Sequence, residues 1–422
     1  MKNNILVVVE SLDINDSSAT KGRVSLIQNL ILCGFKLKVL HYSRKKIDFT
    51  TLPFDEKYCL PIKEKKIGIF YFLSRIERIF TRVTKISLNK YFENWFGFSF
   101  THFNDVNSIC SAIQKENFSH FQIVLTLSKG ANFKPHFAML KANKWQSKWV
   151  AYIHDPYPYH FYPKPYNWKQ PGYIQKEKLF REVSEKAKFA IFPSKLLKDW
   201  MVQYFPNFKQ TGLIIPHQMQ EFLDFKTQHQ DILKPTDFNI LHAGSLMRQR
   251  NPDSLIKGFQ LFLQNNPNAV NHSKLIFIGA GDYFEELILN LGKDFSKNIL
   301  LIKKPMPFNL VFNLQKLASV NVILESDAEF SPFLPGKFPH CIIANKPILL
   351  VGPPLSETKR LLGDNYKYWS EAKNVNKIYD ILGILYDRYQ NNILDCSIEY
   401  QSIKSYLGSK YLEDQFNYIL QK

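Results

Sequence analysis

The feature that most constrains the fold is an alternation of short apolar runs with longer amphipathic segments through residues 238–351. Each apolar run has the length and the aliphatic content of a strand that is buried on both faces. Strands that alternate with helices in this way form parallel sheets with helices on both sides. The sequence therefore predicts a doubly wound α/β domain, with strands at 238–242, 274–278, 299–302, 320–324 and 347–351 and helices at 252–262 and 307–317.

A second alternation fills the first half of the chain. It predicts strands at 5–9, 35–41, 121–127, 148–153, 189–193 and 213–215, and helices at 20–33, 105–116, 133–145, 174–187 and 194–205. A chain of 422 residues is too long for one ordinary core, and the polar stretch 218–237 suits a linker. We expect an N-terminal domain at 1–216, a C-terminal domain at 217–395, and a segment at 396–422 whose helix, 409–420, crosses back to the first domain.

The loop between the strands at 320–324 and 347–351 is a candidate anion site. Pro335, Gly336 and Lys337 stand where a short helix begins. Backbone N–H groups without partners, the positive end of the helix dipole and one ammonium group can converge there on a diphosphate. The alternative interpretation is an ordinary loop with a solvated lysine.

Two further loops of the second half follow predicted strands. In the first, Gly244 lets the backbone approach a ligand closely, Arg250 can offer a bidentate charge to phosphate oxygens, and Asn251 caps a helix that has Pro252 in its first turn. In the second, Gly279 and Gly281 form a GxG pair, which is a weak indication by itself.

His154 follows the predicted strand at 148–153 directly, and ligands of open α/β sheets bind at the carboxyl ends of strands. Its imidazole can donate or accept a proton near pH 7. A histidine with a purely structural role is the alternative, although the aromatic loop YPYHFYPKPYNW after it suits contact with a sugar or a lipid. Arg23, in the first turn of the helix at 20–33, either faces the ligand or is a solvated surface arginine.

The positive charge is concentrated in one half of the chain. Residues 1–215 carry 33 Lys and Arg against 16 Asp and Glu, whereas residues 216–422 carry 22 against 21. This asymmetry indicates a polyanionic partner for the first half, either nucleic acid or an anionic membrane surface, and a charge that only aids solubility would be spread more evenly.

Residues 61–100 combine apolar side chains at helical spacing with basic ones and end in an aromatic cluster. Such a segment either lies on a bilayer surface with its apolar face among the headgroups or packs that face on the core with its charges outward. The sequence leaves both alternatives open.

Cysteine usage and the chain start favour the cytosol. Five scattered cysteines form no CxxC pair, which is typical of reduced thiols and indicates neither a disulfide framework nor a zinc site. The start, MKNNILVVVESLD, has too short an apolar stretch for a secretory signal, and no run of about 18 apolar residues occurs. We expect a cytoplasmic protein, peripheral on the inner face of the plasma membrane if the first half binds lipid.

Three stretches, in this order and spacing, resemble one family: HAGSLMRQRNPDSLIKGF, LIFIGAGDYFEEL and SPFLPGKFPHCIIANKPILL. They look like the nucleotide-sugar half of a group 1 glycosyltransferase, the large retaining family of the GT-B fold. YIHDP and LIIPHQM match its acceptor half more loosely. The resemblance implies an α/β chain of two Rossmann-like doubly wound domains that face a central crevice.

By this resemblance Arg250 and Lys337 hold the donor diphosphate, and His154 lies near the transferred sugar. The residues that it implies around the donor are Gly244, Ser245, Arg248, Gly279, Gly281, Gly336, Phe338 and His340. Some positions depart from the family. Its paired glutamates fall on Pro332 and His340, with Glu329 three residues out of register; Ser245 replaces a frequent arginine, for which Arg248 can substitute; and Ser17 and Ser18 replace its Gly-Gly pair.

The activity implied is transfer of a sugar from a nucleoside-diphosphate sugar to a saccharide or a lipid-linked acceptor, with retention, in the synthesis of cell-surface glycans. No cofactor or metal is expected beyond the donor, because charged side chains and helix N–H groups can stabilise the leaving diphosphate. Two alternatives remain, a catalytically degenerate nucleotide-sugar-binding protein and a nucleic-acid binder, and no nucleic-acid motif favours the latter.

Overall fold

The computed structural model describes residues 4–14, 18–43, 46–86, 88–128, 132–219, 232–279, 281–303 and 306–422. Within this part the chain forms two compact units. Unit 1 comprises residues 1–162, 167–218 and 409–422, and unit 2 comprises residues 163–166 and 219–408. Ser17 and most of the expected linker, 220–231, lie outside the described residues.

Unit 1 contains a seven-stranded sheet in the order β3-β2-β1-β4-β5-β6-β7, and every pair of neighbouring strands is parallel. The strands are β1 (Asn4–Val9), β2 (Lys36–His41), β3 (Cys59–Pro61), β4 (Ile123–Leu127), β5 (Trp149–Tyr152), β6 (Phe189–Phe192) and β7 (Gly212–Ile214). All the strands predicted for the first half are confirmed, and within its described residues only the short edge strand β3 is additional.

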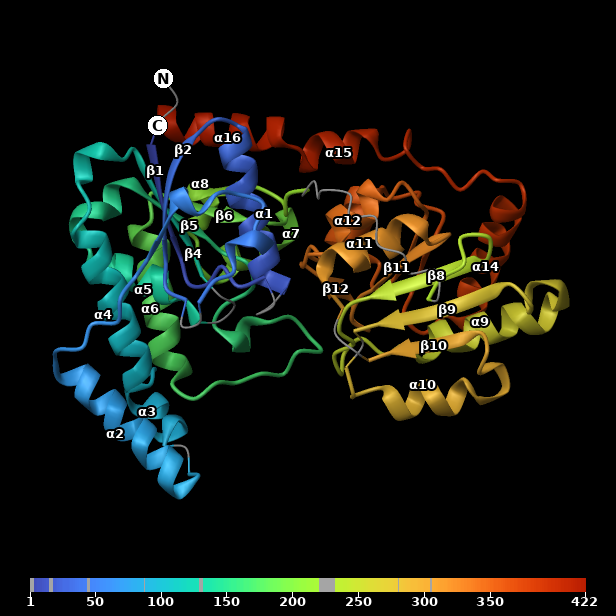
Figure 1. Cartoon of the computed structure of the whole chain (residues 1–422), viewed down its shortest axis with the longest axis horizontal. Helices are drawn as coiled ribbons and strands as arrows, with labels where there is room; N and C mark the ends of the chain where they lie inside the picture. Colours follow the sequence, from blue (N-terminus) through green and yellow to red (C-terminus); the bar gives the residue numbers. More distant parts are fainter. Residues whose placement is uncertain are drawn as a thin grey trace. The chain divides into compact units, whose positions relative to one another are not determined.

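Helices cover both faces of this sheet (Figure 1). On one face α4 (Phe100–Gln114), α5 (Lys134–Lys141), α6 (Tyr173–Lys186) and α7 (Lys195–Tyr204) pack on side chains such as Leu6 and Val8. On the other, α1 (Ser18–Leu32) and α16 (Ser409–Gln421) pack on Ile5 and Val7. The alternation of neighbouring side chains between two buried faces explains why β1 is a continuous apolar run.

Unit 2 contains a six-stranded parallel sheet in the order β10-β9-β8-β11-β13-β15. The strands are β8 (Phe238–Ala243), β9 (Ser273–Ile278), β10 (Ile299–Ile302), β11 (Val320–Leu324), β13 (Ile348–Val351) and β15 (Trp369–Ser370). One face packs against α9 (Asp253–Asn265), α10 (Glu285–Leu291) and α14 (Val375–Gln390), and the other against α11 (Phe308–Leu317), α12 (Phe338–Ile343) and α15 (Gln401–Leu407).

Three smaller elements complete unit 2. The strands β12 (Phe330–Ser331) and β14 (Leu355–Ser356) pair in parallel, and α13 (Glu357–Leu362) follows β14. The predicted doubly wound architecture of both halves is thus confirmed. None of the described helices is long and apolar enough to cross a membrane.

The C-terminal helix α16 completes the core of unit 1, because Leu412, Phe416 and Ile419 are buried in its packing with α1 and β2. The Phe416 ring is fully buried and lies 5.9 Å from that of Phe35. We expect Phe416→Ala to lower the free energy of unfolding of unit 1 by about 3–5 kcal/mol, since a buried ring leaves a cavity.

Urea unfolding followed by fluorescence measures this loss. Asp414→Ala is the matched control on the same helix, because Asp414 is exposed and makes one surface ion pair with Lys410, at 3.0 Å, that contributes no more than about 1 kcal/mol. Equal effects of the two substitutions would contradict the assignment of α16 to the core.

Candidate functional site

The strand order of unit 2 creates a switch point between β8 and β11. From β8 the chain proceeds to β9 and β10 on one side of the sheet, and it then returns to β11 on the other side of β8. The loops that leave β8 and β11 therefore diverge at their carboxyl ends, which is where open α/β sheets bind ligands. Gly244 directly follows β8, and Glu325 directly follows β11.

Lys337 brings the predicted anion-binding loop to this switch point. Although part of the side chain reaches solvent, its ammonium donates a hydrogen bond to the carbonyl of Val322 in β11, with a distance of 3.2 Å from Nζ to the oxygen. A Cβ added at Gly244, whose φ is +135°, would lie 3.8 Å from the same Nζ. The predicted residues Gly244 and Lys337, far apart in sequence, are thus neighbours, and Lys337 is not the solvated lysine of the alternative interpretation.

Burial lowers the pKa of the Lys337 ammonium to about 7. Among the charges around it, Arg250 lowers this pKa further, while Cys341 and Glu325 oppose the shift. A ligand with negative charge at this point would favour the protonated form, since an opposite charge nearby raises the pKa of an amine.

Arg250 is the second cation of the group. It is half-buried in the loop after β8, and among the described residues its buried Nε has no hydrogen-bond partner. Because buried polar groups are nearly always hydrogen-bonded, an orphaned guanidinium N–H near a second cation can bind an anionic ligand.

The loop around Arg250 is held by its own backbone. Arg250 N donates to Met247 O at 2.8 Å, and Asn251 Oδ1 accepts from Asp253 N at 2.9 Å where α9 begins. Asn251 thus makes a hydrogen bond of the kind expected from a cap, but α9 begins at Asp253 and has Pro252 at its N-cap position. The predicted cap at Asn251 and the predicted place of Pro252 in the first turn are therefore each wrong by one residue. Asp327 N donates to Gln249 O at 3.1 Å, which joins this loop to the one that follows β11.

Glu325 is a residue of the group that the sequence did not single out. It is buried, accepts a hydrogen bond from Thr358 Oγ1 at 2.7 Å, and crowds Gly352, where an added Cβ would lie 2.8 Å from the Glu325 Cβ. Burial raises its pKa to about 7, against the hydrogen bonds from Thr358 and Ser356 and the charge of Arg250. Its position directly after a buried strand was the available signal, but no motif surrounds it.

His242, at the end of β8, was also missed. Burial holds the pKa of its imidazole well below the usual range, and the charges of Lys337 and Arg250 act in the same direction. It therefore stays neutral at pH 7 and adds a polar but uncharged ring beside the two cations. Because His242 lies within the predicted strand at 238–242, nothing in the sequence indicated that it belongs to the site.

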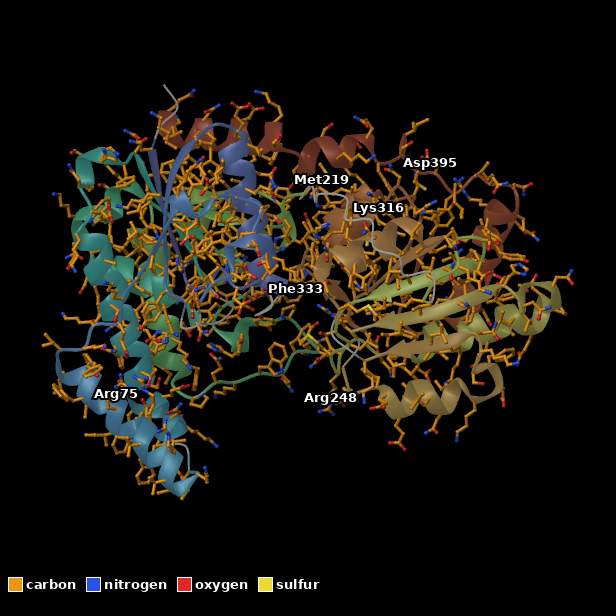
Figure 2. All side chains as sticks on the ribbon, viewed as in Figure 1. Arg75, Met219, Arg248, Lys316, Phe333 and Asp395 are labelled. Carbon is orange, nitrogen blue, oxygen red and sulfur yellow. The ribbon has the colours of Figure 1, made fainter. Side chains whose placement is uncertain are left out.

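The other residues that were predicted to contact the donor differ in their exposure and in their position around this group. Ser245 and Arg248 are exposed in the loop after β8, and Figure 2 labels Arg248 there. Gly279 and Gly281, with φ values of +68° and +75°, follow β9, the strand beside β8. Gly336 is exposed, whereas Phe338 is fully buried in the core of unit 2. Contact of these residues with a donor stays a prediction.

Pro332 and His340, which occupy the positions of the family's paired glutamates, are both buried. His340 is buried, with its ring 4.8 Å from that of Phe308 and 5.6 Å from that of Phe312, and Pro332 is buried as well. Glu329 is exposed. A carboxylate is therefore absent from both positions, and His340 is held by aromatic packing.

His154 belongs to unit 1, where it follows β5 as predicted. Its ring lies 4.5 Å from that of Tyr152, and among the described residues its buried Nε2 has no hydrogen-bond partner. Burial, with the nearby charge of Arg23 and the rings of His217 and His136, holds its pKa well below the usual range. The imidazole is therefore neutral at pH 7, and it presents a buried polar atom that a ligand could satisfy.

Arg23 is not solvated. It is fully buried, and it donates to Ser128 O at 2.6 Å and to Thr20 Oγ1 at 2.5 Å. The surface alternative for Arg23 is wrong, because the side chain joins α1 to the end of β4. Its positive charge contributes to the lowered pKa of His154.

The aromatic loop after His154 divides into two parts. Tyr157 is fully buried, with its ring 4.1 Å from that of Phe133, and is part of the core. Tyr159, Tyr162 and Trp168 form a separate cluster with centroid distances of 5.0 to 5.5 Å. Among the described residues no group of three or more His, Cys, Asp or Glu side chains is placed to hold a metal ion.

The chain matches no protein-family model and no curated protein sequence. It does resemble solved structures. Anabaena HepE in complex with UDP and glucose matches with a TM-score of 0.64 and 11% identity, over 99% of both chains. A glycosyltransferase from Rickettsia africae matches with a TM-score of 0.61 and 11% identity, over 100% of this chain and 98% of that one.

A UDP-forming α,α-trehalose-phosphate synthase from Burkholderia xenovorans, in complex with glucose-6-phosphate, matches with a TM-score of 0.59 and 10% identity. The match covers 99% of this chain and 100% of that one. These likenesses span whole chains, and they show that this chain has the GT-B fold of two Rossmann-like domains that the sequence predicted.

The buried carboxyl of Glu325 predicts a pH-dependent stability. Its pKa is raised from 4.5 to about 7 in the folded chain, so the folded state binds more protons than the unfolded state between these values. The stabilisation by Glu325 is thus complete below about pH 4.5 and is lost as the pH rises to about 7.

We expect Glu325→Gln to raise the stability of unit 2 relative to the wild type above pH 7, by a margin that shrinks toward pH 4.5. Thermal unfolding at a series of pH values measures the margin, and the exposed Glu329→Gln serves as the control. Parallel pH profiles for the wild type and Glu325→Gln would show that Glu325 keeps an ordinary pKa.

Proposed function

We propose that the chain is a glycosyltransferase that moves a sugar from a nucleoside-diphosphate sugar to an acceptor hydroxyl. The observation that carries this proposal is a pair of interacting cations, Arg250 and Lys337, at the switch point of the unit 2 sheet, with the Lys337 ammonium beside Gly244. The GT-B fold supports it, because solved proteins of this fold include HepE in complex with UDP and glucose.

In this proposal Arg250 and Lys337 stabilise the negative charge that develops on the diphosphate as it leaves the sugar. Fixed charges that are already in place cost little reorganisation during the reaction and act strongly where water is excluded. The exposed backbone of Gly244 and Gly336 leaves room for close approach of the phosphates. The transfer needs no metal in this scheme, since the two cations supply the charge.

His154 is proposed to act on the transferred sugar and the acceptor. A neutral imidazole with an unsatisfied buried nitrogen can hydrogen-bond a sugar hydroxyl and orient it. Retention at the anomeric carbon is proposed on the family resemblance, since it depends on the face from which the acceptor attacks.

The acceptor is proposed to be a saccharide or a lipid-linked glycan, in the synthesis of cell-surface glycans on the cytoplasmic side of the plasma membrane. All five cysteines are free thiols, which agrees with a reducing compartment. The separate cluster of Tyr159, Tyr162 and Trp168 offers ring faces that suit stacking on a sugar.

A catalytically degenerate nucleotide-sugar-binding protein is the second candidate. The observation that favours it is the lack of a carboxylate at Pro332 and His340, where the family has its paired glutamates. The two candidates differ in one respect: only the transferase releases nucleoside diphosphate from the donor when an acceptor is present.

We expect Arg250→Ala and Lys337→Ala each to raise the activation free energy of donor turnover by about 1.5–3 kcal/mol. Each substitution removes a charge-assisted contact to the diphosphate. Release of nucleoside diphosphate, measured with the donor found in a screen of UDP-, GDP- and dTDP-sugars, gives kcat/KM for each variant. Lys297→Ala, an exposed lysine of the same unit, is the control and should leave kcat/KM unchanged. Normal kinetics in both site variants would refute this position for the diphosphate.

His154→Ala should lower kcat much more than it changes donor affinity, because its proposed partners are the sugar and the acceptor. Donor affinity is measured by calorimetry, and kcat from nucleoside diphosphate release. His120→Ala is the control, since His120 lies in a surface turn of the same unit. An unchanged kcat would leave His154 with a structural role only.

A further inference from the structure

Helix α2 (Ile69–Thr84) carries its apolar side chains on the outside of the protein. Its row of large aliphatic and aromatic residues has exposed fractions between 60% and 75%, and comprises Ile69, Phe72, Ile76, Ile79 and Val83. Residues spaced by three and four positions lie on one side of a helix, so these side chains form a single stripe. Figure 1 shows α2 extending away from the sheet of unit 1 together with α3 (Asn89–Phe96).

The side of α2 that faces the protein is unusually polar. Ser74 and Glu77 are buried there, and Glu77 Oε2 accepts hydrogen bonds from Thr101 N and Thr101 Oγ1 of α4, both at 3.1 Å. Of the aromatic residues, Phe70 stacks on Phe103 of α4 with a centroid distance of 5.0 Å. Burial raises the pKa of Glu77, as expected of a carboxyl in such a position.

The helix is therefore amphipathic, but its apolar side faces outward and its polar side faces the protein. The alternative in which the segment 61–100 packs its apolar face on the core is wrong for α2, because that face is exposed while a serine and a glutamate are buried. Monomeric soluble proteins rarely expose a contiguous apolar patch of this kind, and such patches mark contacts with membranes or other proteins.

Helix α3, which extends from unit 1 together with α2 (Figure 1), also carries large exposed apolar side chains. Trp95 is 76% exposed and Tyr91 is 65% exposed, and Ile67 and Ile86, just outside the ends of α2, are exposed as well. Tryptophan and tyrosine favour the boundary between water and hydrocarbon, because their rings are apolar and their N–H or O–H group stays hydrated. We name these residues, with the α2 stripe, the docking face.

The charge around the docking face selects among partners. Residues 61–97 contain eight basic and three acidic residues. The acids are already satisfied: Glu77 is buried on Thr101, Glu64 pairs with Arg75 at 3.5 Å and with Arg78 at 3.1 Å, and Glu93 pairs with Lys176 at 3.1 Å. Arg75 is labelled on α2 in Figure 2.

Exposed cations therefore remain in α2, in α3 and in the stretches next to them, among them Lys65, Lys66, Arg82, Lys85 and Lys90. A surface that joins apolar insertion to positive charge is complementary to an anionic bilayer, in which lipid headgroups meet the cations and acyl chains meet the stripe. A second copy of this chain would bring like charges together at the same place.

We propose that α2 and α3 bind the surface of an anionic lipid bilayer, with the docking face inserted among the headgroups and the surrounding lysines and arginines on the lipid phosphates. The attachment depends on unit 1 alone. This proposal deepens the proposed function, because the bilayer is the surface at which the enzyme would meet a lipid-linked acceptor. Only this link to the acceptor rests on the proposed function; membrane binding itself does not.

Flotation with vesicles tests the proposal on the full chain without donor or acceptor, so its outcome is independent of transferase activity. We expect binding to vesicles of phosphatidylcholine with about one part in three of phosphatidylserine, and little binding to phosphatidylcholine alone. Binding should weaken as the Debye length falls from ~10 Å at 0.1 M salt to ~3 Å at 1 M.

Two sets of substitutions separate the apolar and the electrostatic contributions. Phe72→Ser, Ile76→Ser and Ile79→Ser together should lower vesicle affinity by more than about tenfold, because they remove exposed apolar groups that insert. Lys66→Glu, Arg82→Glu and Lys90→Glu together should lower it by at least about a hundredfold. An unchanged thermal midpoint for each variant shows that the fold is intact.

A matched control reverses three exposed lysines elsewhere in unit 1: Lys115→Glu, Lys186→Glu and Lys209→Glu. This triple variant has the same net charge as the first charge-reversal variant, and it should keep vesicle binding within a few-fold of the wild type. Equal losses for the two charge-reversal variants would mean a diffuse electrostatic attraction, which contradicts a docking face.

Two further outcomes would overturn the proposal. One is a vesicle affinity that is the same for anionic and neutral lipid, or the same for the wild type and the serine variant. The other is a wild-type chain that fails to bind vesicles and sediments as a dimer, which the three serine substitutions convert to a monomer. That outcome would assign the docking face to an interface between copies of the chain.

Discussion

The candidate site depends on the parallel pairing of β8 with β11. This pairing places the ends of two buried strands, and the two loops that leave them, side by side in the middle of the unit 2 sheet. Lys337 then reaches back from the next loop to the carbonyl of Val322 in β11, and its ammonium lies beside Gly244. Two cations and a buried carboxyl gather there because the strand order reverses at this point, which brings Arg250 close to Glu325 and Lys337 although it is distant from them in sequence.

Electrostatic repulsion is the cost of this arrangement. Lys337 and Arg250 disfavour each other's charge, and burial lowers the pKa of Lys337 to about 7. Glu325 offsets part of the repulsion, but it is itself buried and has a raised pKa. A site with two crowded cations and unsatisfied hydrogen-bonding groups gains most from a ligand that brings negative charge, and this is the physical basis on which a diphosphate is proposed.

Much of the fold could be predicted from sequence, because buried parallel strands are continuous apolar runs. The runs at 299–302 and 320–324 coincide with β10 and β11 to the residue. Short elements such as β15, Trp369–Ser370, were missed, since two residues carry no periodicity. The direction of α2 could not be predicted either. The spacing of Phe72, Ile76 and Ile79 shows that they share one side of a helix, but only the contacts of Ser74 and Glu77 show that this side points outward.

The site residues divide in the same way. Gly244 and Lys337 stand in loops whose composition indicates a ligand, and the structure brings them together. The sequence left two alternatives open for Arg23. The solvated one is wrong, because the side chain is buried on Ser128. Glu325 and His242 give no local pattern, and their importance arises from burial beside Arg250, which only the tertiary structure reveals.

Calorimetric titration with nucleoside mono- and diphosphates measures the central claim, recognition of a diphosphate at the ends of β8 and β11, most directly. For the base that the chain prefers, the diphosphate should bind at least about tenfold more tightly than the monophosphate, because Arg250 and Lys337 each contribute a charge-assisted contact to the added phosphate. Equal affinities for the two, or no binding of any nucleoside diphosphate, would contradict it.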